Sequence, residues 1–304
     1  MKRSALLLLT MLLTAVCAAE EVSRLDAEAG VRKDLLAKGV SLGSDETGDV
    51  YTVVASAERV CRGVSAACAV RTVCFRMAEL RARHQIMNAR GMTASGMTSI
   101  GGGQDVTVRT KTVETLIETF ARQTLLGCEL VGYREGMTGE RYVVALALRW
   151  RKDLERAEQA SAAGVFMPAE DWREAFRCQY GERKGELLPP TGVFVDARGF
   201  VHRYGVGFAD VTRANAQARS AAASFADLFA RKNLQLALCG DAEMRKVAVA
   251  ALAKGNFRST ASVYEALGTV TASGAFPPGA RSVLERLVAH PVTGRSVYMV
   301  VYGL

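Results

Sequence analysis

Histidine is scarce in this sequence, with 3 in 304 residues. His84, His202 and His290 lie far apart in the chain, and none forms a metal-binding or catalytic-triad motif with its neighbours. His84 lies on a helical face with Met77, Leu80 and other apolar residues, which is typical of a packed histidine. We therefore predict no catalytic, cofactor-binding or metal-ligating residue.

Long apolar runs are absent beyond the N-terminus, so we expect no transmembrane segment there. The apolar run at residues 5–16 follows two basic residues and precedes small residues and then Glu20. This order is typical of a secretory signal peptide over residues 1–19, with cleavage after Ala18 or Ala19. The alternative is an N-terminal anchor that is never cut.

Cys17 opens a further alternative, a lipoprotein whose mature N-terminus is an acylated cysteine. That processing favours Leu three residues before the cysteine and a small residue directly before it. This chain has Thr14 and Val16 at those places. We expect an exported protein, periplasmic or secreted, and leave open an outer-membrane association and a lipid anchor at Cys17.

The composition after the leader is that of a globular protein, with 49% hydrophobic and 23% charged residues in the full chain. The length that remains fits two domains. The net charge of +8 comes from basic residues scattered among acidic ones. Such mild basicity favours anionic lipid, glycan or acidic partners. We expect no nucleic-acid partner, because an exported protein rarely meets one.

Six cysteines remain after Cys17, and export permits disulfides among them. They are Cys61, Cys68, Cys74, Cys128, Cys178 and Cys239. The spacings of the first three fit no zinc pattern. We predict one disulfide, Cys61–Cys68, which would close a short loop; the alternative is that these cysteines pack as small apolar side chains.

Two stretches of the chain resemble each other. The segments "DVYTVVASAERV" (49–60) and "FVHRYGVGFADV" (200–211) both predict a strand, and a helix follows each. In the second helix six apolar residues share one face at helical spacing. They are Ala218, Ala221, Ala222, Phe225, Leu228 and Phe229.

Each stretch also closes with a predicted hairpin. "ELVGYREGMTGERYVVALAL" matches "RLVAHPVTGRSVYMVVYGL" in the order strand, Thr-Gly turn, strand, with Tyr142 opposite Tyr298. The last strands are apolar on both faces, so they belong inside a sheet or under a helix. The middles of the two copies do not match. Duplication explains the shared order; the alternative is two unrelated domains that both end in hairpins.

We therefore predict an α+β fold of two duplicated domains, each an antiparallel sheet backed by one or two helices. The first domain spans 20–155 and includes an N-terminal helix near 22–37. A helical, proline-containing linker spans 156–196 and folds back to bury its aromatic residues. The second domain spans 197–304.

The signal peptide, the segment "VVASA", the Ala-rich helices ("AELRARHQIMNA", "ARSAAASFADLFA") and the strand "YVVALAL" together resemble a family. The pattern is similar to small domains of bacterial envelope lipoproteins and to the N-terminal domain of the periplasmic flagellar assembly protein T. The resemblance covers most of residues 48–150 and 199–304. It implies envelope assembly and protein contacts, and it supplies no catalytic residue.

Enzymatic alternatives rest on weak motifs. "GVSLG" (39–43) fits G-x-S-x-G around Ser41, but a helix precedes it and a strand follows, the reverse of a nucleophile elbow. "SIGGGQD" (99–105) lacks the Gly-Lys-Ser/Thr ending of a phosphate loop. Residues 149–152, which include Trp150, either cap a sheet or form a partner surface, and capping is the preferred interpretation.

We expect a non-catalytic, envelope-associated or secreted interaction module whose partners are envelope or extracellular proteins or glycans. Two diverged copies with different middles motivate this expectation, because the variable loops of a rigid frame are where binding usually lies. The alternative is a secreted or periplasmic hydrolase of unknown substrate that uses Ser41 or a His site.

Overall fold

A computed structural model describes residues 22–63, 66–90, 126–161, 174, 176, 187–196, 199–253, 276 and 278–304. For residues 161, 194 and 238–253 it describes the backbone alone. Within these ranges, none of the helices combines the length and the apolar character that crossing a membrane requires.

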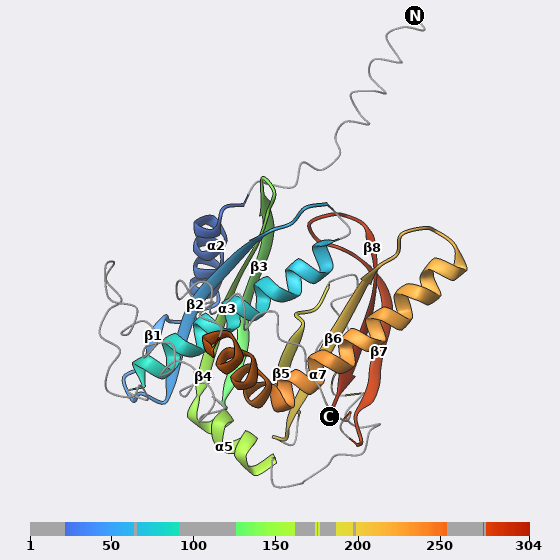
Figure 1. Cartoon of the computed structure of the whole chain (residues 1–304). Coiled ribbons are helices and arrows are strands. Elements are labelled where there is room, and N and C mark those ends of the chain that lie inside the picture. The colour runs from blue at the N-terminus through green and yellow to red at the C-terminus, as the bar shows by residue number, and fades with distance from the viewer. Residues whose placement is uncertain are drawn as a thin grey trace, which may run out of the picture.

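The described chain is an α+β protein, as predicted (Figure 1). Its helices and strands follow in this order: α2 (Arg24–Ala37), β1 (Gly43–Ser44), β2 (Val50–Val60), α3 (Ala67–Ala89), β3 (Cys128–Thr138), β4 (Arg141–Arg151), α5 (Lys152–Ser161), β5 (Thr191–Val195), β6 (Val201–Asp210), α7 (Ala216–Ala253), β7 (Arg281–Ala289) and β8 (Ser296–Gly303).

The strands form two four-stranded antiparallel sheets with matching order. The first is β1-β2-β4-β3 and the second is β5-β6-β8-β7. The short first strand of each sheet was missed in the sequence, and β5 lies inside the predicted linker. Edge strand β3 of the first sheet contacts edge strand β5 of the second, so the two units stand head to tail.

Each closing hairpin carries a β-bulge, and the two bulges lie at equivalent places. Ala57 pairs with Val144 and Ala209 with Tyr298, which makes Val144 and Tyr298 equivalent. In the same alignment Val131 of β3 and Val283 of β7 are the extra residues of the bulges. A shared bulge supports duplication, because bulges are retained as designed features. The predicted match of Tyr142 with Tyr298 is wrong by two residues.

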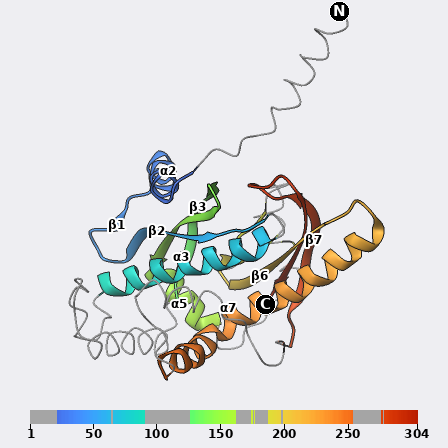
Figure 2. The same cartoon turned by 45° about the horizontal axis from the view of Figure 1, so that its top comes forward.

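The first sheet is covered on both faces, as the apolar character of β4 predicts. Val143, Ala145 and Ala147 pack against α2, whereas the residues that alternate with them pack in a cluster with α3. The two helices lie on opposite sides of the sheet (Figure 2). Such double burial is what a central strand with no polar face requires.

Helix α2 has well-defined ends. Ser23 and Asp26 form a capping box at its start. At its end Gly39 adopts φ +71°, and the Val40 N–H donates to the Leu35 carbonyl at 2.9 Å. This is a Schellman motif, which a glycine in the left-handed region allows, and it terminates the helix at Gly39.

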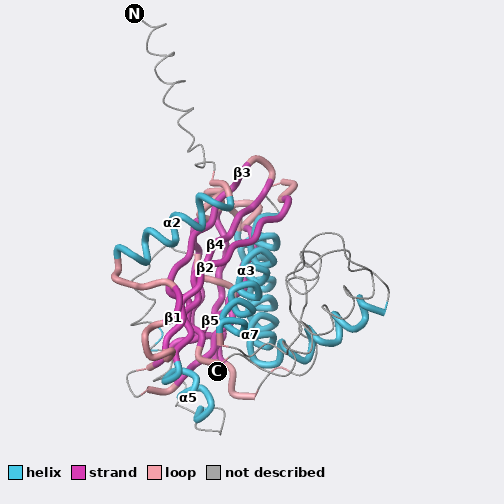
Figure 3. Tube along the Cα trace, turned by 90° about the vertical axis from the view of Figure 1, so that its left-hand side faces the viewer, coloured by secondary structure: helices cyan, strands magenta, loops and turns pink. Residues whose placement is uncertain are grey.

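Helix α7 lies unusually close to the second sheet because β6 carries glycines beneath it. A Cβ atom at Gly207 would lie 1.9 Å from the Ala226 carbonyl oxygen, and one at Gly205 would lie 2.1 Å from the Leu234 nitrogen. The alanines of α7 complete this close approach, since Ala226 and Ala230 are both fully buried. Helices α3 and α7 share one side of the strands (Figure 3).

The opposite face of the second sheet, away from α7, packs against residues of the predicted linker. Phe176, Leu187 and Leu188 lie against its apolar side chains, and Glu174 and Phe176 are helical. Phe176 is fully buried, with its ring centroid 5.4 Å from that of Tyr204. In the second unit, therefore, linker residues cover the face of the sheet that corresponds to the face covered by α2 in the first unit.

Candidate functional site

A buried polar cluster lies where the two units meet, and we call it the seam. It consists of Arg71, Tyr133, Glu135, Tyr142 and His290. Arg71, on α3, is fully buried. It binds Glu135 of β3 through two donors, at 2.6 and 3.1 Å. It also donates to the main-chain oxygens of Leu188 (3.0 Å) and Leu187 (3.2 Å). One guanidinium thus joins the first unit to the segment that leads into the second sheet.

The carboxylate of Glu135 organises the rest of the seam. It accepts hydrogen bonds from the hydroxyls of Tyr133 (2.9 Å) and Tyr142 (2.7 Å) in addition to the Arg71 pair. Burial by itself lowers the pKa of Arg71, but the charge of Glu135, the two tyrosines and the hydrogen bond to Glu135 together outweigh it, so the net pKa is raised. Burial raises the pKa values of both tyrosines. The seam therefore holds one paired charge and two neutral phenols.

The ring of Phe208 on β6 completes the contact from the second unit. The guanidinium carbon of Arg71 lies 4.9 Å from the Phe208 ring centroid and 5.6 Å from that of Tyr133. A guanidinium placed between two aromatic rings gains cation–π attraction while it is kept from water. Arg71 is therefore held by both units at once.

His290 reaches the seam from the second unit, directly after β7. Its Nδ1 accepts from the backbone N–H groups of Val292 (3.2 Å) and Thr293 (3.3 Å). The proton of the neutral ring must therefore sit on Nε2, which is buried and has no hydrogen-bond partner among the described residues. The ring meets Tyr142 edge-on, at 5.9 Å and 89° between ring planes. Burial lowers the pKa of His290 to about 4.

A smaller polar contact flanks the seam. Cys68 Sγ lies 3.8 Å from Asp210 Oδ1, at the end of β6. Burial, followed by the charge of Asp210, raises the pKa of Cys68 to about 12. Burial also raises the pKa of Asp210. A thiol this far from ionisation is a poor nucleophile at neutral pH.

The cysteines of the predicted disulfide are described as free thiols. Cys61 packs in the core beneath α3 together with Cys74, whereas Cys68 packs in the core of the second sheet. The alternative reading of these cysteines as small apolar side chains thus fits the described positions, and the Cys61–Cys68 bond stays a prediction. Cys17, Ala18, Ala19 and Cys178 lie outside the described residues, as does the side chain of Cys239.

The residues of the enzymatic alternative lie in three unrelated settings. Ser41 is exposed in the turn after α2. His84 is on α3, 3.3 Å from Asn88 and with its pKa lowered by burial. His202 lies 3.1 Å from the buried carboxylate of Asp196 in the β5–β6 hairpin, where Asp196 also accepts from the Phe200 backbone N–H. Across the described residues, no three His, Cys, Asp or Glu side chains gather where they could hold a metal ion.

Residues 149–152 lie at the end of the first sheet and cap it, which is the interpretation preferred from the sequence over a partner surface. Trp150 is buried beneath the guanidinium of Arg90, 3.6 Å from its ring centroid. Arg151 pairs with Asp153, and Lys152 pairs with Asp49 at 2.9 Å. These charges are paired within the chain, so the segment stabilises the sheet end.

A second candidate feature is the outward side of α7. The helical spacing in the sequence predicted that its residues belong to the apolar, buried face of the helix. Phe225 is 57% exposed, and Leu228 and Phe229 are each 44% exposed. The buried side is offset from these residues by one position and consists mainly of alanines. It comprises Ala222, Ala226, Ala230 and Leu234. The glycines of β6 select this narrow alanine side, so the large side chains remain in solvent.

The first unit treats the corresponding positions differently. The fully buried Cys74, Ala78 and Ala82 of α3 match Ala226, Ala230 and Leu234 of α7 in spacing, which aligns Val73 and Met77 with Phe225 and Phe229. Met77 is 5% exposed and Val73 is half-buried. Leu228 aligns in the same way with Arg76, which is also buried. The second unit therefore exposes large apolar side chains at positions that the first unit largely covers. We call Phe225, Leu228 and Phe229 the α7 face.

The comparisons with known proteins show the fold alone. No family model and no curated protein matches the chain. A solved structure does match, described as the 2.3 Å crystal structure of hypothetical protein FTT1539c from Francisella tularensis. The likeness covers 95% of this chain and 93% of that chain, with a TM-score of 0.59 and 13% sequence identity. The chain is thus similar, over nearly its whole length, to a two-sheet α+β structure of an uncharacterised bacterial protein.

Proposed function

We propose that the protein is a non-catalytic, exported interaction module of the cell envelope, and that the α7 face is one of its contact surfaces. The observation that carries the proposal is the exposure of three large apolar side chains on neighbouring turns of one helix. Apolar surface of this kind is costly to leave in water and commonly marks an interaction site. The equivalent positions of α3 are covered, so exposure is not a requirement of the fold.

The seam supports the same proposal through the rigidity that it gives to the two units. The carboxylate of Glu135 and the donors of Arg71 that bind it are satisfied by groups of the chain itself. A buried network of paired donors and acceptors rigidifies the segments that it joins. The seam therefore fixes the relative position of two units, which suits a scaffold that presents separate surfaces.

The test places a photo-crosslinking amino acid at position 229 of the full chain in intact cells, with position 287 as the control. Leu287 is also 44% exposed but lies on β7, away from the α7 face. We expect adducts with envelope components at position 229 and far fewer at position 287. Equal labelling at both positions, or a soluble chain that forms no adduct at either, contradicts the proposal.

Export of the protein can be tested separately from its interactions. Mass spectrometry of the protein from cells is expected to find a mature chain that begins at Ala19 or Glu20. An acylated N-terminus at Cys17 would establish the lipid-anchored variant. A chain that still begins at residue 1 and remains in the cytoplasm would refute export.

A further inference from the structure

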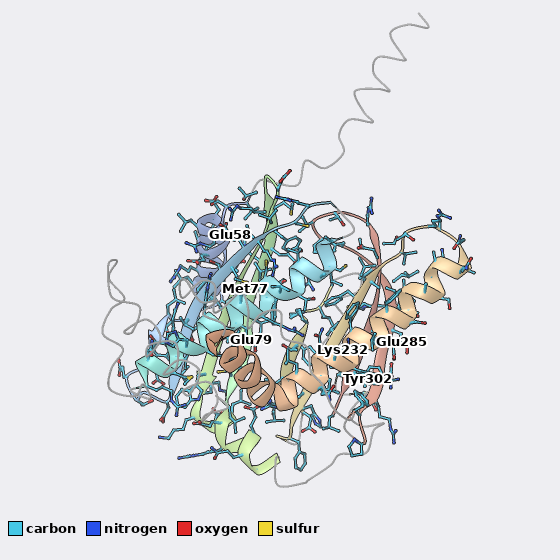
Figure 4. All side chains as sticks on the ribbon, in the orientation of Figure 1. Glu58, Met77, Glu79, Lys232, Glu285 and Tyr302 are labelled. Atoms are coloured by element: carbon cyan, nitrogen blue, oxygen red, sulfur yellow. The ribbon has the colours of Figure 1, made fainter. Side chains whose placement is uncertain are left out.

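We propose that the α7 face binds an anionic lipid surface, an inference that rests on the proposed role in the envelope and names one of its partners. The first step is geometry. Phe225, Leu228 and Phe229 are spaced by three and four residues, so their side chains leave the helix on one side. Lys232 continues the same row, and it lies on α7 in Figure 4.

The second step is charge. The stretch 212–232 holds four basic residues and one acidic residue. Arg213 and Arg219 are exposed near the start of α7. Asp227 is already paired with Arg231 at 2.8 Å. Lys232, which is half-buried, is therefore the basic residue in the row of the α7 face, and the two exposed arginines add positive charge near the start of the helix. The net charge of +8 for the whole chain has the same sign.

Exposed aromatic and aliphatic side chains beside basic ones are the combination that peripheral helices use at membranes. The apolar side chains enter the boundary between headgroups and acyl chains, while Lys and Arg remain at the level of the anionic headgroups. A protein partner would have to supply both an apolar surface and acidic groups, whereas an anionic bilayer supplies both over any area. The lipid surface is therefore the occupant that the composition of the α7 face favours.

Helix α7 is positioned to make this contact without unfolding. Its sheet-facing alanines stay packed on Gly205 and Gly207, and the face that would enter the lipid is already in solvent. Binding therefore requires no rearrangement of the core. The helix would lie along the surface with the second sheet behind it.

The experiment is co-sedimentation of the mature full-length protein with vesicles of phosphatidylcholine containing phosphatidylglycerol, compared with phosphatidylcholine alone. We expect binding to the anionic vesicles that weakens as salt rises. The F225S/F229S double variant should bind at least about tenfold more weakly, because both apolar contacts are lost. Lys232→Glu should weaken binding to the anionic vesicles specifically. Leu287→Ser is the matched control, with an exposed apolar side chain removed elsewhere, and should bind like the parent protein.

The inference is overturned if the parent protein does not bind anionic vesicles, or if the double variant and Leu287→Ser bind equally. Circular dichroism and thermal unfolding of each variant verify that it is folded, and the Lys232→Glu arm tests the inference without touching an apolar residue. If vesicle binding fails while crosslinking at position 229 still yields protein adducts, the lipid inference fails and the interaction module stands. If both fail, the proposed function fails as well.

Discussion

Arg71 Nη1 donates to the main-chain oxygen of Leu188 at 3.0 Å, across the boundary between the two units. The same guanidinium pairs with Glu135, so the charge that holds β3 to α3 also holds the segment entering the second sheet. One buried ion pair thus contributes to the relative position of the two sheets. Both partners are nearly free of water, with side-chain exposures of 0% and 7%.

Replacing either partner of this pair should destabilise the whole chain. Removing one member of a buried ion pair leaves the other charge unpaired and typically costs about 3–5 kcal/mol. We expect Glu135→Gln and Arg71→Met each to lower the free energy of unfolding in urea by about 3 kcal/mol. The double variant should lose less than the sum. Glu58→Gln, which breaks the exposed pair with Arg141, is the control and should cost under about 1 kcal/mol. Equal losses for Glu58→Gln and Glu135→Gln would contradict the role of the seam.

Acid should weaken the protein through His290. Its folded pKa of about 4 lies below its ordinary value of 6.5, so between these pH values the unfolded chain binds a proton that the folded chain does not. Stability therefore falls as pH drops from about 6.5 to about 4, by up to about 3 kcal/mol. The Arg71 guanidinium and the Glu135 carboxylate face the ring and act in opposite directions on its charge.

His290→Asn is the matching variant for this pH dependence. The Asn side-chain oxygen can accept from the Val292 and Thr293 N–H groups and does not titrate. Urea unfolding at several pH values should show a shallower slope for the variant between pH 4 and 6.5. An unchanged slope would assign the pH dependence to other groups.

Gly207→Ala tests the close packing of α7 on β6. The added Cβ would lie 1.9 Å from the Ala226 oxygen and 2.3 Å from the Ala230 nitrogen, both backbone atoms that cannot turn aside. We expect a loss of about 2–3 kcal/mol in thermal or urea unfolding. In Gly30→Ala the three atoms nearest to the new Cβ all belong to the Arg134 side chain, the first at 2.6 Å, and that side chain is about half exposed and can move. This control should leave stability within about 1 kcal/mol, since Ala also favours the helix.

The buried thiols should resist modification in the folded protein. Burial raises the pKa values of Cys68, Cys74 and Cys128 to about 12, which leaves almost no thiolate at pH 8. A disulfide reagent should therefore react with them far more slowly in the native chain than in urea. Rapid labelling of all three in the native state would show that the cores open readily. Non-reducing peptide mapping of the same protein tests the predicted Cys61–Cys68 bond directly.

The fold was largely predictable because its signals are local. The apolar run Tyr142–Leu148 predicts a central strand, and the Thr-Gly turns place both hairpins. Strands β1 and β5 were missed because they are short and gain their stability from pairing with β2 and β6. The Tyr142–Tyr298 match failed because like residues were aligned, whereas the equivalent position to Tyr298 in the ladder holds Val144.

The seam could not have been predicted in the same way. Arg71 and Glu135 are 64 residues apart, and each looks like an ordinary surface charge in its own segment. Only the packing of α3 against β3 and Leu188 removes them from water. The one feature of the sequence that pointed to the seam was Arg71, an arginine on an otherwise apolar side of α3. Helical periodicity alone does not predict that such a residue is buried in an ion pair.

The sequence by itself determined the two copies, their longer strands and the double burial of β4, because periodicity and turn chemistry act over a few residues. The tertiary structure decided which side of each helix is inside. In α7 the glycines of β6 bring the helix so close that its buried side consists mainly of alanines, so Phe225 and Phe229 lie outside, although their spacing alone places them on a core face. Burial depends on how closely another backbone can approach, and that distance is set by residues remote in the chain.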